Sequence, residues 1–467
     1  MIRMIRAALG ALLVCAAVTG CDDFLTGEGI DRDPNLPSQA TRDQLFVAMQ
    51  AAQFGQQEGP IAQVVCMWMQ QCSGVGGRFV ENRGRDYAIQ STDFSPDFTA
   101  IYTGGGLIDL RAIQATSEEE GDRIYLGIAK AWEGLLISFA ADVWGDIPYR
   151  EAANPEIDAP VHDPQLQVYD DVLVLLDEAI ADLQSGAGDG PGLLDLIYGG
   201  DADKWIEAAN TLKARIHLHT AEVRGAAAYQ AAITAATNGI SAPANDFRTA
   251  HTEATSERNM WFQFSETTFG QDIVAGAFLA NLMVGRNDPR LPEYFGRNAL
   301  GGFGGDDVNS VTPANQVSPL TGSARLTPTF RQPVMTWAEN QLILAEAKLQ
   351  VTGQAAAQPH LDAVRSAIGL GSVPATLQNI MTEKYIALFQ NVEAWNDYKR
   401  TCLPALDPSG SETQIPGRLF YGQTELNANP NTPSEAQQNQ NGGAAVSQPQ
   451  GPQRNPNDPD NPGSTTC

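Results

Sequence analysis

Apolar residues recur along this chain at steps of three and four positions, the spacing of one face of an α-helix. Between Tyr125 and Val143 the set is Ile128, Trp132, Leu135, Leu136, Phe139 and Val143. The same spacing returns in four further segments, at about 169–183, 203–223, 334–350 and 377–399. Each such helix has an apolar stripe that a neighbouring helix must cover. The pattern therefore predicts a mostly α-helical protein.

Turn-forming residues separate the first of these helices. Gly145 can end a helix in a left-handed conformation, and Pro148 then prevents the helix from resuming. Asp146 can accept hydrogen bonds from backbone donors in that turn. Helices joined by modest connections favour antiparallel pairs that stack as a helical-repeat array. The sequence shows no repeat of fixed period, so the array is predicted from the hydrophobic pattern alone.

Two regions lack this periodicity. Residues 245–331 are rich in Gly, Asn, Thr and aromatic residues, which predicts long irregular loops on the helical frame. Residues 433–467 are rich in Gln, Asn, Pro and Gly with few apolar side chains, which predicts a disordered tail. The expected organisation is a leader of residues 1–20, a helical body of residues 21–432 and this tail.

The N-terminal segment has the form of a secretory signal. Arg3 and Arg6 precede an apolar run of about a dozen residues, shorter than the roughly 20 that a membrane span needs. Val18-Thr19-Gly20-Cys21 fits a bacterial lipobox, in which the chain is cut before Cys21 and the thiol is acylated. Two or more acyl chains anchor a protein stably, so we expect a lipid anchor at Cys21. The alternative is an ordinary cleaved signal with an incidental cysteine.

The composition is strongly acidic, with 55 acidic and 29 basic residues and a formal net charge of −26. Cleavage of the leader removes Arg3 and Arg6 and no acidic residue, so the mature body is more acidic still. A polyanion repels nucleic acid and anionic lipid surfaces. We therefore expect no nucleic-acid partner, and we expect the acyl chains alone to hold the body at a membrane.

Six cysteines are present, of which one leaves with the leader and Cys21 is acylated. The remaining four would reach an oxidising compartment, where disulfides form. Cys66 and Cys72 would lie on different faces of one continuous helix, so a bond between them requires a break in that helix. Cys402 and Cys467 can join and hold the tail. No pair has CxxC spacing, which disfavours a zinc or redox site.

Catalytic motifs are absent from the sequence: it has no GxSxG elbow, no HExxH and no GxxxxGK[ST] loop. His217 and His219 are two positions apart and diverge on a helix, which favours packing over a shared metal. Asp306, Asp307 and Asn309 offer oxygen ligands for calcium, but their spacing does not fit a helix–loop–helix hand. We therefore expect no enzyme activity, no metal and no cofactor.

Eight segments in order along the chain resemble the SusD/RagB family of outer-membrane nutrient-binding lipoproteins. The sharpest match is AADVWGDIPYREA at residues 140–152. The other seven are Cys21–Leu25, Ile101–Leu107, Gly199–Arg215, Asn287–Leu291, Trp337–Ala347, Glu383–Asp397 and Arg418–Pro433. The resemblance thus spans about residues 21–433. It implies a body of tetratricopeptide-like helical units with long loops that carry the binding surface.

The resemblance also implies a function and a location. Proteins of this family sit as a lid on a TonB-dependent transporter of the SusC type, capture a glycan, oligosaccharide or peptide, and pass it to the barrel. Asp22-Asp23 is similar to the export signal of surface lipoproteins in bacteria that carry the family. An aspartate at this place retains lipoproteins at the inner membrane in other bacteria. The expected location is the outer membrane, facing the exterior.

Carbohydrate sites combine aromatic faces with amides, carboxylates or arginines that bind hydroxyl groups. Outside the periodic helices, the loop-rich middle offers Trp261, Phe262 and Phe264. An early loop-like stretch, where the resembling family often contributes polar contacts, offers Arg83, Tyr87, Asp93 and Phe94. For each aromatic ring, core packing under a loop is the alternative.

These features predict a surface lipoprotein that binds oligosaccharide or peptide nutrients without altering them and delivers them to a transporter. The alternative is a helical scaffold lipoprotein that holds partner proteins and binds no ligand. A secreted hydrolase is a third class, disfavoured because no nucleophile or metal set is visible in the sequence.

Overall fold

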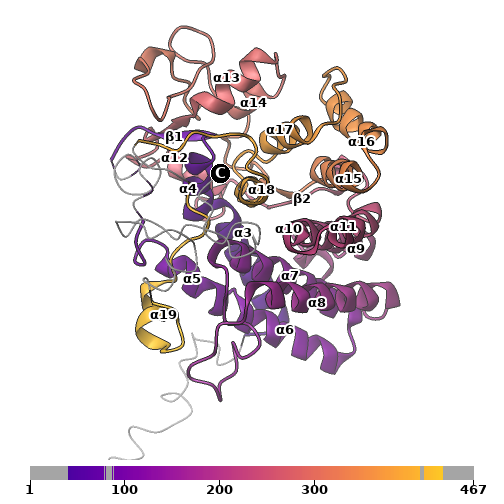
Figure 1. Cartoon of the computed structure of the whole chain (residues 1–467). Coiled ribbons are helices and arrows are strands. Elements are labelled where there is room, and N and C mark those ends of the chain that lie inside the picture. Colours follow the sequence, from indigo (N-terminus) through magenta and orange to yellow (C-terminus); the bar gives the residue numbers. More distant parts are fainter. Residues whose placement is uncertain (1–39, 78, 80–86, 88, 411–414, 435–467) are drawn as a thin grey trace, which may run out of the picture.

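The computed structural model describes residues 40–77, 79, 87, 89–410 and 415–434 (Figure 1). The chain folds mostly into helices, with two short antiparallel strand pairs among the described residues. The prediction of a mostly α-helical protein is therefore confirmed. The predicted leader, the acylation site Cys21 and nearly all of the predicted tail lie outside the described residues.

The helices fall into three stretches of the chain. The first stretch contains α3 (Arg42–Glu58), α4 (Pro60–Trp68), α5 (Ser95–Tyr102), α6 (Leu107–Glu120), α7 (Arg123–Trp144) and α8 (Gln165–Ser185). The second contains α9 (Ala202–His219), α10 (Ala221–Arg224), α11 (Ala226–Thr237), α12 (Met260–Ser265), α13 (Ala277–Gly285) and α14 (Leu291–Tyr294). The third contains α15 (Trp337–Val351), α16 (Gln354–Ala367), α17 (Leu377–Ala387), α18 (Glu393–Thr401) and α19 (Gln423–Ala428).

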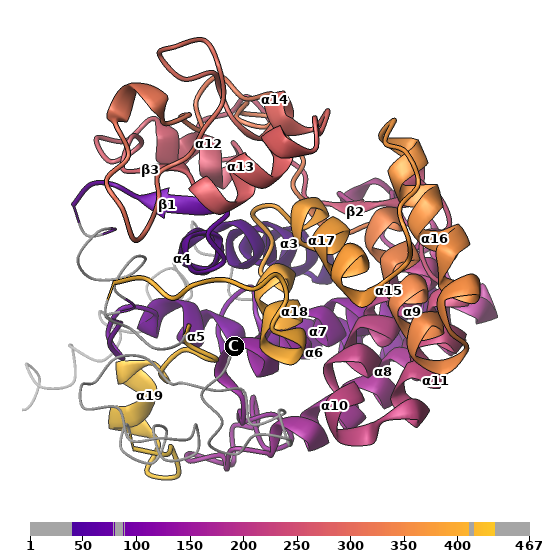
Figure 2. The ribbon, with the colours of Figure 1, turned by 45° about the horizontal axis from the view of Figure 1, so that its top comes forward.

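Consecutive long helices pack side by side as a tetratricopeptide-like array. α6 packs on α7, α7 on α8, α8 on α9, α9 on α11, α11 on α15 and α15 on α16. In Figure 2 α8, α9, α11, α15 and α16 form a stacked column along one side of the molecule. Each apolar stripe is covered by the next helix, as the hydrophobic pattern predicted.

α7 is the central helix of this array. Of the described residues, only α7 is long and apolar enough to cross a membrane, and 89% of its most apolar window is buried inside the body. It is therefore the core helix of a globular body. A Cβ on Gly127 would lie 2.8 Å from the Ala179 carbonyl oxygen, so glycine at this position permits α7 and α8 to approach closely.

The turn after α7 follows the sequence prediction in most respects. The helix ends at Trp144, and Gly145 has φ 84° and ψ −119°, a positive φ outside the αL region. The Asp146 carboxylate accepts a hydrogen bond from the Gln165 N–H (2.9 Å), at the start of α8. The turn therefore links α7 to α8 through a side-chain acceptor.

One predicted helix is two helices. The periodic segment 377–399 divides into α17 and α18, because Gln390 has a positive φ of 61° that a helix interior does not allow. Asn391 Oδ1 then accepts the Glu393 N–H (2.9 Å) just before α18, whose N-cap is Val392. The prediction of one helix was wrong, because the polar residues at 390 and 391 form a turn between α17 and α18.

Most of the loop-rich segment 245–331 forms a separate layer with short elements, above the array in Figure 2. β3 (Ile273–Ala275) pairs with β1 (Cys72–Gly74), and β2 (Phe247–Arg248) pairs with β4 (Pro333–Met335), both antiparallel. A disulfide joins Cys66 to Cys72. α4 ends at Trp68, so the break in the helix that this bond requires is present.

Candidate functional site

A hollow of about 570 Å³ opens between α13, the loop at residues 306–309 and the segment at residues 405–407. This volume lies within the range of pockets that hold small ligands, about 300–1,000 Å³. We call it the acidic hollow, and its principal lining residues are Gln70, Phe278, Asn281, Asp306, Asp307 and Asp407. None of the described residues that line it is basic. The site is therefore concave, polar and negatively charged.

Two glycines bring the acidic loop against the β1–β3 pair. A Cβ on Gly305 would lie 2.4 Å from the backbone of Gly276, and a Cβ on Gly276 would lie 2.3 Å from the Gln70 carbonyl oxygen. Only glycine permits this approach. It lets the Asp306 N–H donate to the Ala275 carbonyl oxygen (2.8 Å) and the Ala277 N–H donate to the Asp306 carbonyl oxygen (2.9 Å), which fixes the backbone of Asp306. The glycine run that the sequence marks as a loop thus positions an acidic side chain.

Asp306 forms the floor of the acidic hollow and is only 8% exposed. Its Oδ2 accepts a hydrogen bond from the Ser73 hydroxyl (2.7 Å). Gln70, which has a positive φ of 51°, donates from Nε2 to the Asp407 carbonyl oxygen (2.5 Å) and so holds the 405–407 segment as one wall. These contacts come from three distant parts of the chain.

The opposite wall is α13. Phe278 is half-buried, packs edge-to-face on Tyr385 with ring centroids 5.8 Å apart, and lines the hollow. Asn281, one turn further along α13, is exposed and offers an amide at the rim. An apolar ring beside amides and carboxylates is the combination that binds the faces and hydroxyl groups of sugars.

The predicted ligand residues lie elsewhere. Three of the predicted rings, Tyr87, Phe94 and Trp261, are 3%, 1% and 2% exposed and pack in the main hydrophobic core. Burial leaves them almost no face for a ligand in this structure, as the core alternative anticipated. Phe262 and Phe264 are half-buried on α12.

One predicted ring contacts an earlier part of the chain. Phe264 packs edge-to-face on Phe79 with centroids 5.5 Å apart, and the β1–β3 pair lies next to this contact in the chain. Asp93 is half-buried, and its Oδ2 accepts the Gln90 N–H (2.8 Å). Arg83 lies outside the described residues. None of these residues lines the acidic hollow.

A second hollow of about 320 Å³ lies between α3 and α12, and Phe54, Leu196 and Met260 give it a mostly apolar lining. Its one histidine is already occupied, because His251 Nε2 lies 2.8 Å from Oε1 of the buried Glu58. The α3–α12 hollow is smaller than the acidic hollow, and its lining carries both an acidic and a basic residue, Glu257 and Arg258.

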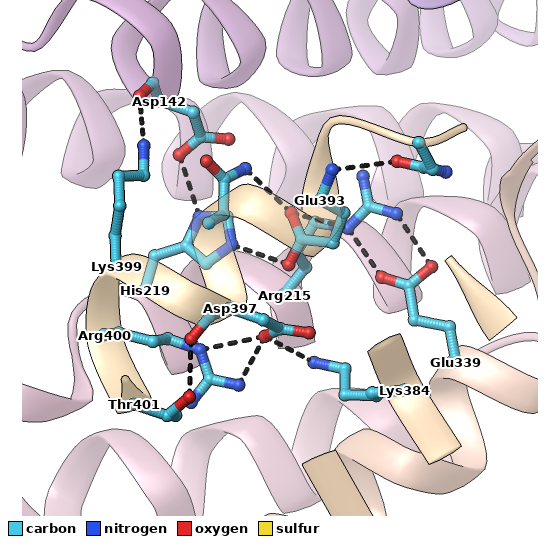
Figure 3. A network of polar contacts seen from close by, with 12 residues as sticks. Asp142, Arg215, His219, Glu339, Lys384, Glu393, Asp397, Lys399, Arg400 and Thr401 are labelled. Carbon is cyan, nitrogen blue, oxygen red and sulfur yellow. Dashed lines mark hydrogen bonds and ion pairs between the residues drawn. The ribbon is translucent and has the colours of Figure 1, made fainter. Parts of the chain in front are cut away.

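A network of buried charges joins the helical array to the C-terminal helices (Figure 3). Arg215 forms two hydrogen bonds to Glu339, at 2.7 and 2.8 Å, and both side chains are buried. Asp397 accepts from Lys384 (2.8 Å) and from Nε of Arg400 (3.0 Å). The network thus binds α9, α15, α17 and α18 to one another with paired charges.

The same network contains the one group of acidic and histidine side chains, among the described residues, that could hold a metal ion: Asp142, His219 and Glu393, whose ligand atoms lie within 4.8 Å of one another. Both ring nitrogens of His219 face a carboxylate at 2.9 Å, which requires a proton on each nitrogen. Burial opposes the charged ring, but the carboxylates of Asp142 and Glu393 raise the pKa of His219 to about 9.

Cations surround these carboxylates. Lys399 Nζ donates to the Asp142 carbonyl oxygen (2.6 Å), and Arg215 Nε lies 3.7 Å from Glu393. Burial raises the pKa of Glu393, but His219 and Arg215 outweigh it and hold this pKa well below its usual range. The donor set therefore fits an imidazolium held by ion pairs better than a metal centre, because metal binding requires a deprotonated imidazole nitrogen.

Sequence reasoning missed the residues of the acidic hollow. In the sequence, Asp306, Asp307 and Asn309 suggested calcium ligands and not one side of a ligand-binding hollow. Phe278 and Asn281 gave no signal, because α13 is short and apolar apart from Asn281 itself. The glycine at 305, immediately before two acidic residues, was the one local clue.

Comparison with known proteins identifies the family. The model of the SusD-like family described as "Starch-binding associating with outer membrane" matches residues 34–422. The chain belongs to this SusD-like family. A search of curated protein sequences found no match. The family membership agrees with the resemblance in eight segments and with the tetratricopeptide-like array.

Solved SusD-like structures share the fold. A SusD/RagB family protein from Bacteroides thetaiotaomicron has a TM-score of 0.68 and 19% identity, and the match covers 84% of this chain and 95% of that protein. A chitin-binding SusD homologue from Flavobacterium johnsoniae has a TM-score of 0.73 and 19% identity, with coverages of 88% and 98%. A third, a SusD homologue from B. thetaiotaomicron, has a TM-score of 0.69 and 18% identity, with coverages of 90% and 99%. At these identities the likeness supports the fold alone.

Proposed function

We propose that this SusD-like chain is a surface-exposed outer-membrane lipoprotein that captures an oligosaccharide or peptide nutrient and delivers it to a TonB-dependent transporter of the SusC type. The acidic hollow is the proposed ligand site. The observation that carries the proposal is this hollow of about 570 Å³, bordered by a ring and by side-chain amides and carboxylates, in a family described as starch-binding.

Three features support capture over catalysis. The described lining of the hollow contains no serine, cysteine, histidine or lysine, so its ionisable groups are carboxylates alone. The histidine that lies between two carboxylates, His219, is buried in the charge network and does not line the hollow. One solved relative is named as chitin-binding and one as a SusD homologue, and neither name refers to catalysis.

The test of ligand capture uses the mature chain with Cys21→Ser, which removes the lipid and keeps the body. Calorimetric titration with an array of oligosaccharides and peptides should find a ligand, and mass spectrometry after incubation should recover that ligand intact. Asn281→Ala should weaken binding about fivefold or more, because the loss of one hydrogen bond costs roughly 1 kcal/mol. Gln230→Ala removes an exposed amide on the distant α11 and should leave affinity unchanged.

The scaffold alternative gives a different result. A protein that only holds partners would bind none of the array, yet would still co-purify with a large β-barrel transporter from outer membranes. Release of a shortened ligand would instead indicate a hydrolase. The lipid anchor has its own test, since palmitate labelling should mark the N-terminal peptide of the wild-type chain and leave Cys21→Ser unlabelled.

A further inference from the structure

The charge of the acidic hollow is one-sided. Asp306, Asp307 and Asp407 line it, and the described lining contains no lysine, arginine or histidine. The three acids do not converge into a metal-binding group among the described residues. Their negative charges are therefore spread over one concave surface. Such a surface disfavours anionic ligands such as uronic-acid chains and favours neutral or cationic ones.

Asp306 differs from the other buried carboxylates of the chain. Its side chain is more than nine-tenths buried, but among the described residues only the Ser73 hydroxyl donates to it, and no cation lies within ion-pair distance. Buried carboxylates such as Glu339 and Asp397 each face at least one arginine or lysine. A buried carboxylate with one neutral donor is costly unless a further donor reaches it.

Elsewhere in the described part of the chain, two buried carboxylates that lack a cation accept hydrogen bonds from several N–H groups. Asp163 accepts two backbone N–H bonds, and Asp195 accepts three backbone N–H bonds and the Trp205 indole. Asp306 has neither a cation partner nor several N–H donors among the described residues, and it lines the hollow. The second oxygen of its carboxylate, Oδ1, is thus available to a donor that enters with a ligand.

The remaining walls suit a sugar more than a purely cationic chain. Phe278 supplies an apolar ring face, and Asn281 supplies an exposed amide that can donate to and accept from hydroxyl groups. Asp407 is exposed at the rim, so a second ammonium group on an adjoining unit of the ligand can approach a carboxylate there.

We propose that the acidic hollow selects oligosaccharides that carry free amino groups, 2-amino-2-deoxy sugars, over neutral or acidic chains of the same length. One ammonium group pairs with Asp306, and the sugar hydroxyls bind Asn281 and the surrounding polar groups. This proposal rests on the proposed function, because it names the ligand class of the same site.

The test compares ligands of equal length on the mature Cys21→Ser chain: a glucosamine hexamer, its fully N-acetylated counterpart, a neutral glucose hexamer and a hexauronate. The glucosamine hexamer should bind about tenfold or more tighter than the acetylated one at pH 6, since hydrogen bonds to charged groups add roughly 1.5–3 kcal/mol. The preference should shrink as salt is raised. The hexauronate should bind weakest.

Asp306→Asn tests the residue itself, because the amide oxygen can still accept from Ser73 while the charge is lost. This variant should lose most of the preference for the glucosamine hexamer over the neutral hexamers. Asp189→Asn, an exposed loop position with the same change in charge, should keep the preference. Circular dichroism on each variant confirms that the fold is retained.

The outcomes separate this proposal from the proposed function. Equal binding of the aminated and acetylated hexamers would overturn the amino-sugar preference and leave capture intact. Failure of every saccharide to bind would contradict capture of sugars in the hollow as well. A preference that survives Asp306→Asn would place the ammonium elsewhere, and tighter binding of a lysine hexapeptide than of the glucosamine hexamer would overturn the sugar assignment.

Discussion

His219 and Glu393 form an ion pair across 174 positions of the chain, with Nε2 of the imidazole 2.9 Å from Oε1 of the carboxylate. Nδ1 of the same ring lies 2.9 Å from Oδ1 of Asp142. The ring on α9 thus joins α7, in the middle of the array, to α18 near its end (Figure 3). A doubly protonated imidazole is therefore part of what holds the early and late helices together.

This arrangement makes stability depend on pH. The pKa of His219 rises from an ordinary 6.5 to about 9 in the folded state, so its contribution is full below pH 6.5 and is lost as pH rises toward 9. Between pH 6.5 and 8 the His219 contribution to the free energy of unfolding should fall by roughly 1.5 kcal/mol. Urea unfolding followed by circular dichroism at half-unit pH steps measures this fall.

Other titrating groups flank this window. Burial lowers the pKa of His162 and His217 to about 4, so these groups raise stability as pH climbs through 6.5, and they offset part of the fall until about pH 7.5. Burial lowers the pKa of Lys399 to about 8, which opposes the fall only above that pH. His219→Gln should flatten the profile from pH 6.5 to 8, while His360→Gln should keep the fall. An unchanged slope in His219→Gln would contradict the assignment.

The buried Arg215–Glu339 pair should behave differently from an exposed pair. Arg215→Met leaves a buried carboxylate without its two hydrogen bonds and should destabilise by about 3–5 kcal/mol. Arg150→Met, in an exposed pair with Asp171, should have a much smaller effect because solvent screens that pair. Adding Glu339→Leu to Arg215→Met should recover part of the loss. Equal effects of the two single substitutions, measured by urea unfolding, would contradict this account of the network.

The helical frame was predictable because it depends on local patterns. The segment from Tyr125 to Val143 became α7 within two residues at each end, since an apolar stripe and a terminal glycine are both local signals. The β1–β3 pair was not predictable, because its strands are three residues long and meet across about 200 positions. The pairing of His219 with Glu393 depends on the tertiary arrangement of α9 and α18, which no spacing in the sequence reveals.

The candidate site was less predictable than the fold. Trp261 was a ligand candidate because it lies in a loop-rich region, with core packing as the alternative, and in the structure α12 carries this ring in the core. The acidic hollow forms where residues near 70, 280, 306 and 407 meet, so only the fold assembles it. Asp306 and Asp307 were visible as an acidic pair, but their burial and partners were not.

Two helical glycines should respond to alanine in opposite ways, because only one of them lies where two helices pack closely. Gly127→Ala would place a Cβ 2.7 Å from Leu183 and should destabilise by about 1–3 kcal/mol, despite the better helix propensity of alanine. Gly55→Ala, in α3 with no atom within 4 Å of the new Cβ, should stabilise by about 0.5–1 kcal/mol. Thermal unfolding of both variants measures the contrast, and a loss of stability in Gly55→Ala would count against it.

The disulfide should matter to both stability and binding. Cys66→Ala with Cys72→Ala removes a short closed loop, which should lower the free energy of unfolding by about 2 kcal/mol. Gln70 lies inside that loop and holds the 405–407 wall of the acidic hollow, so ligand affinity should fall as well. Asn238→Ala, on the distant end of α11, should alter neither measurement strongly. Full affinity in the cysteine variant would show that the loop does not shape the site.

A crystal structure of the mature Cys21→Ser chain with a bound oligosaccharide tests the central claim most directly. The account predicts an intact ligand in the acidic hollow, with one sugar ring beside Phe278 and polar contacts to Asn281 and Asp306. An oligosaccharide bound against α12 with the hollow free of it, or a cleaved product in the site, would contradict the account.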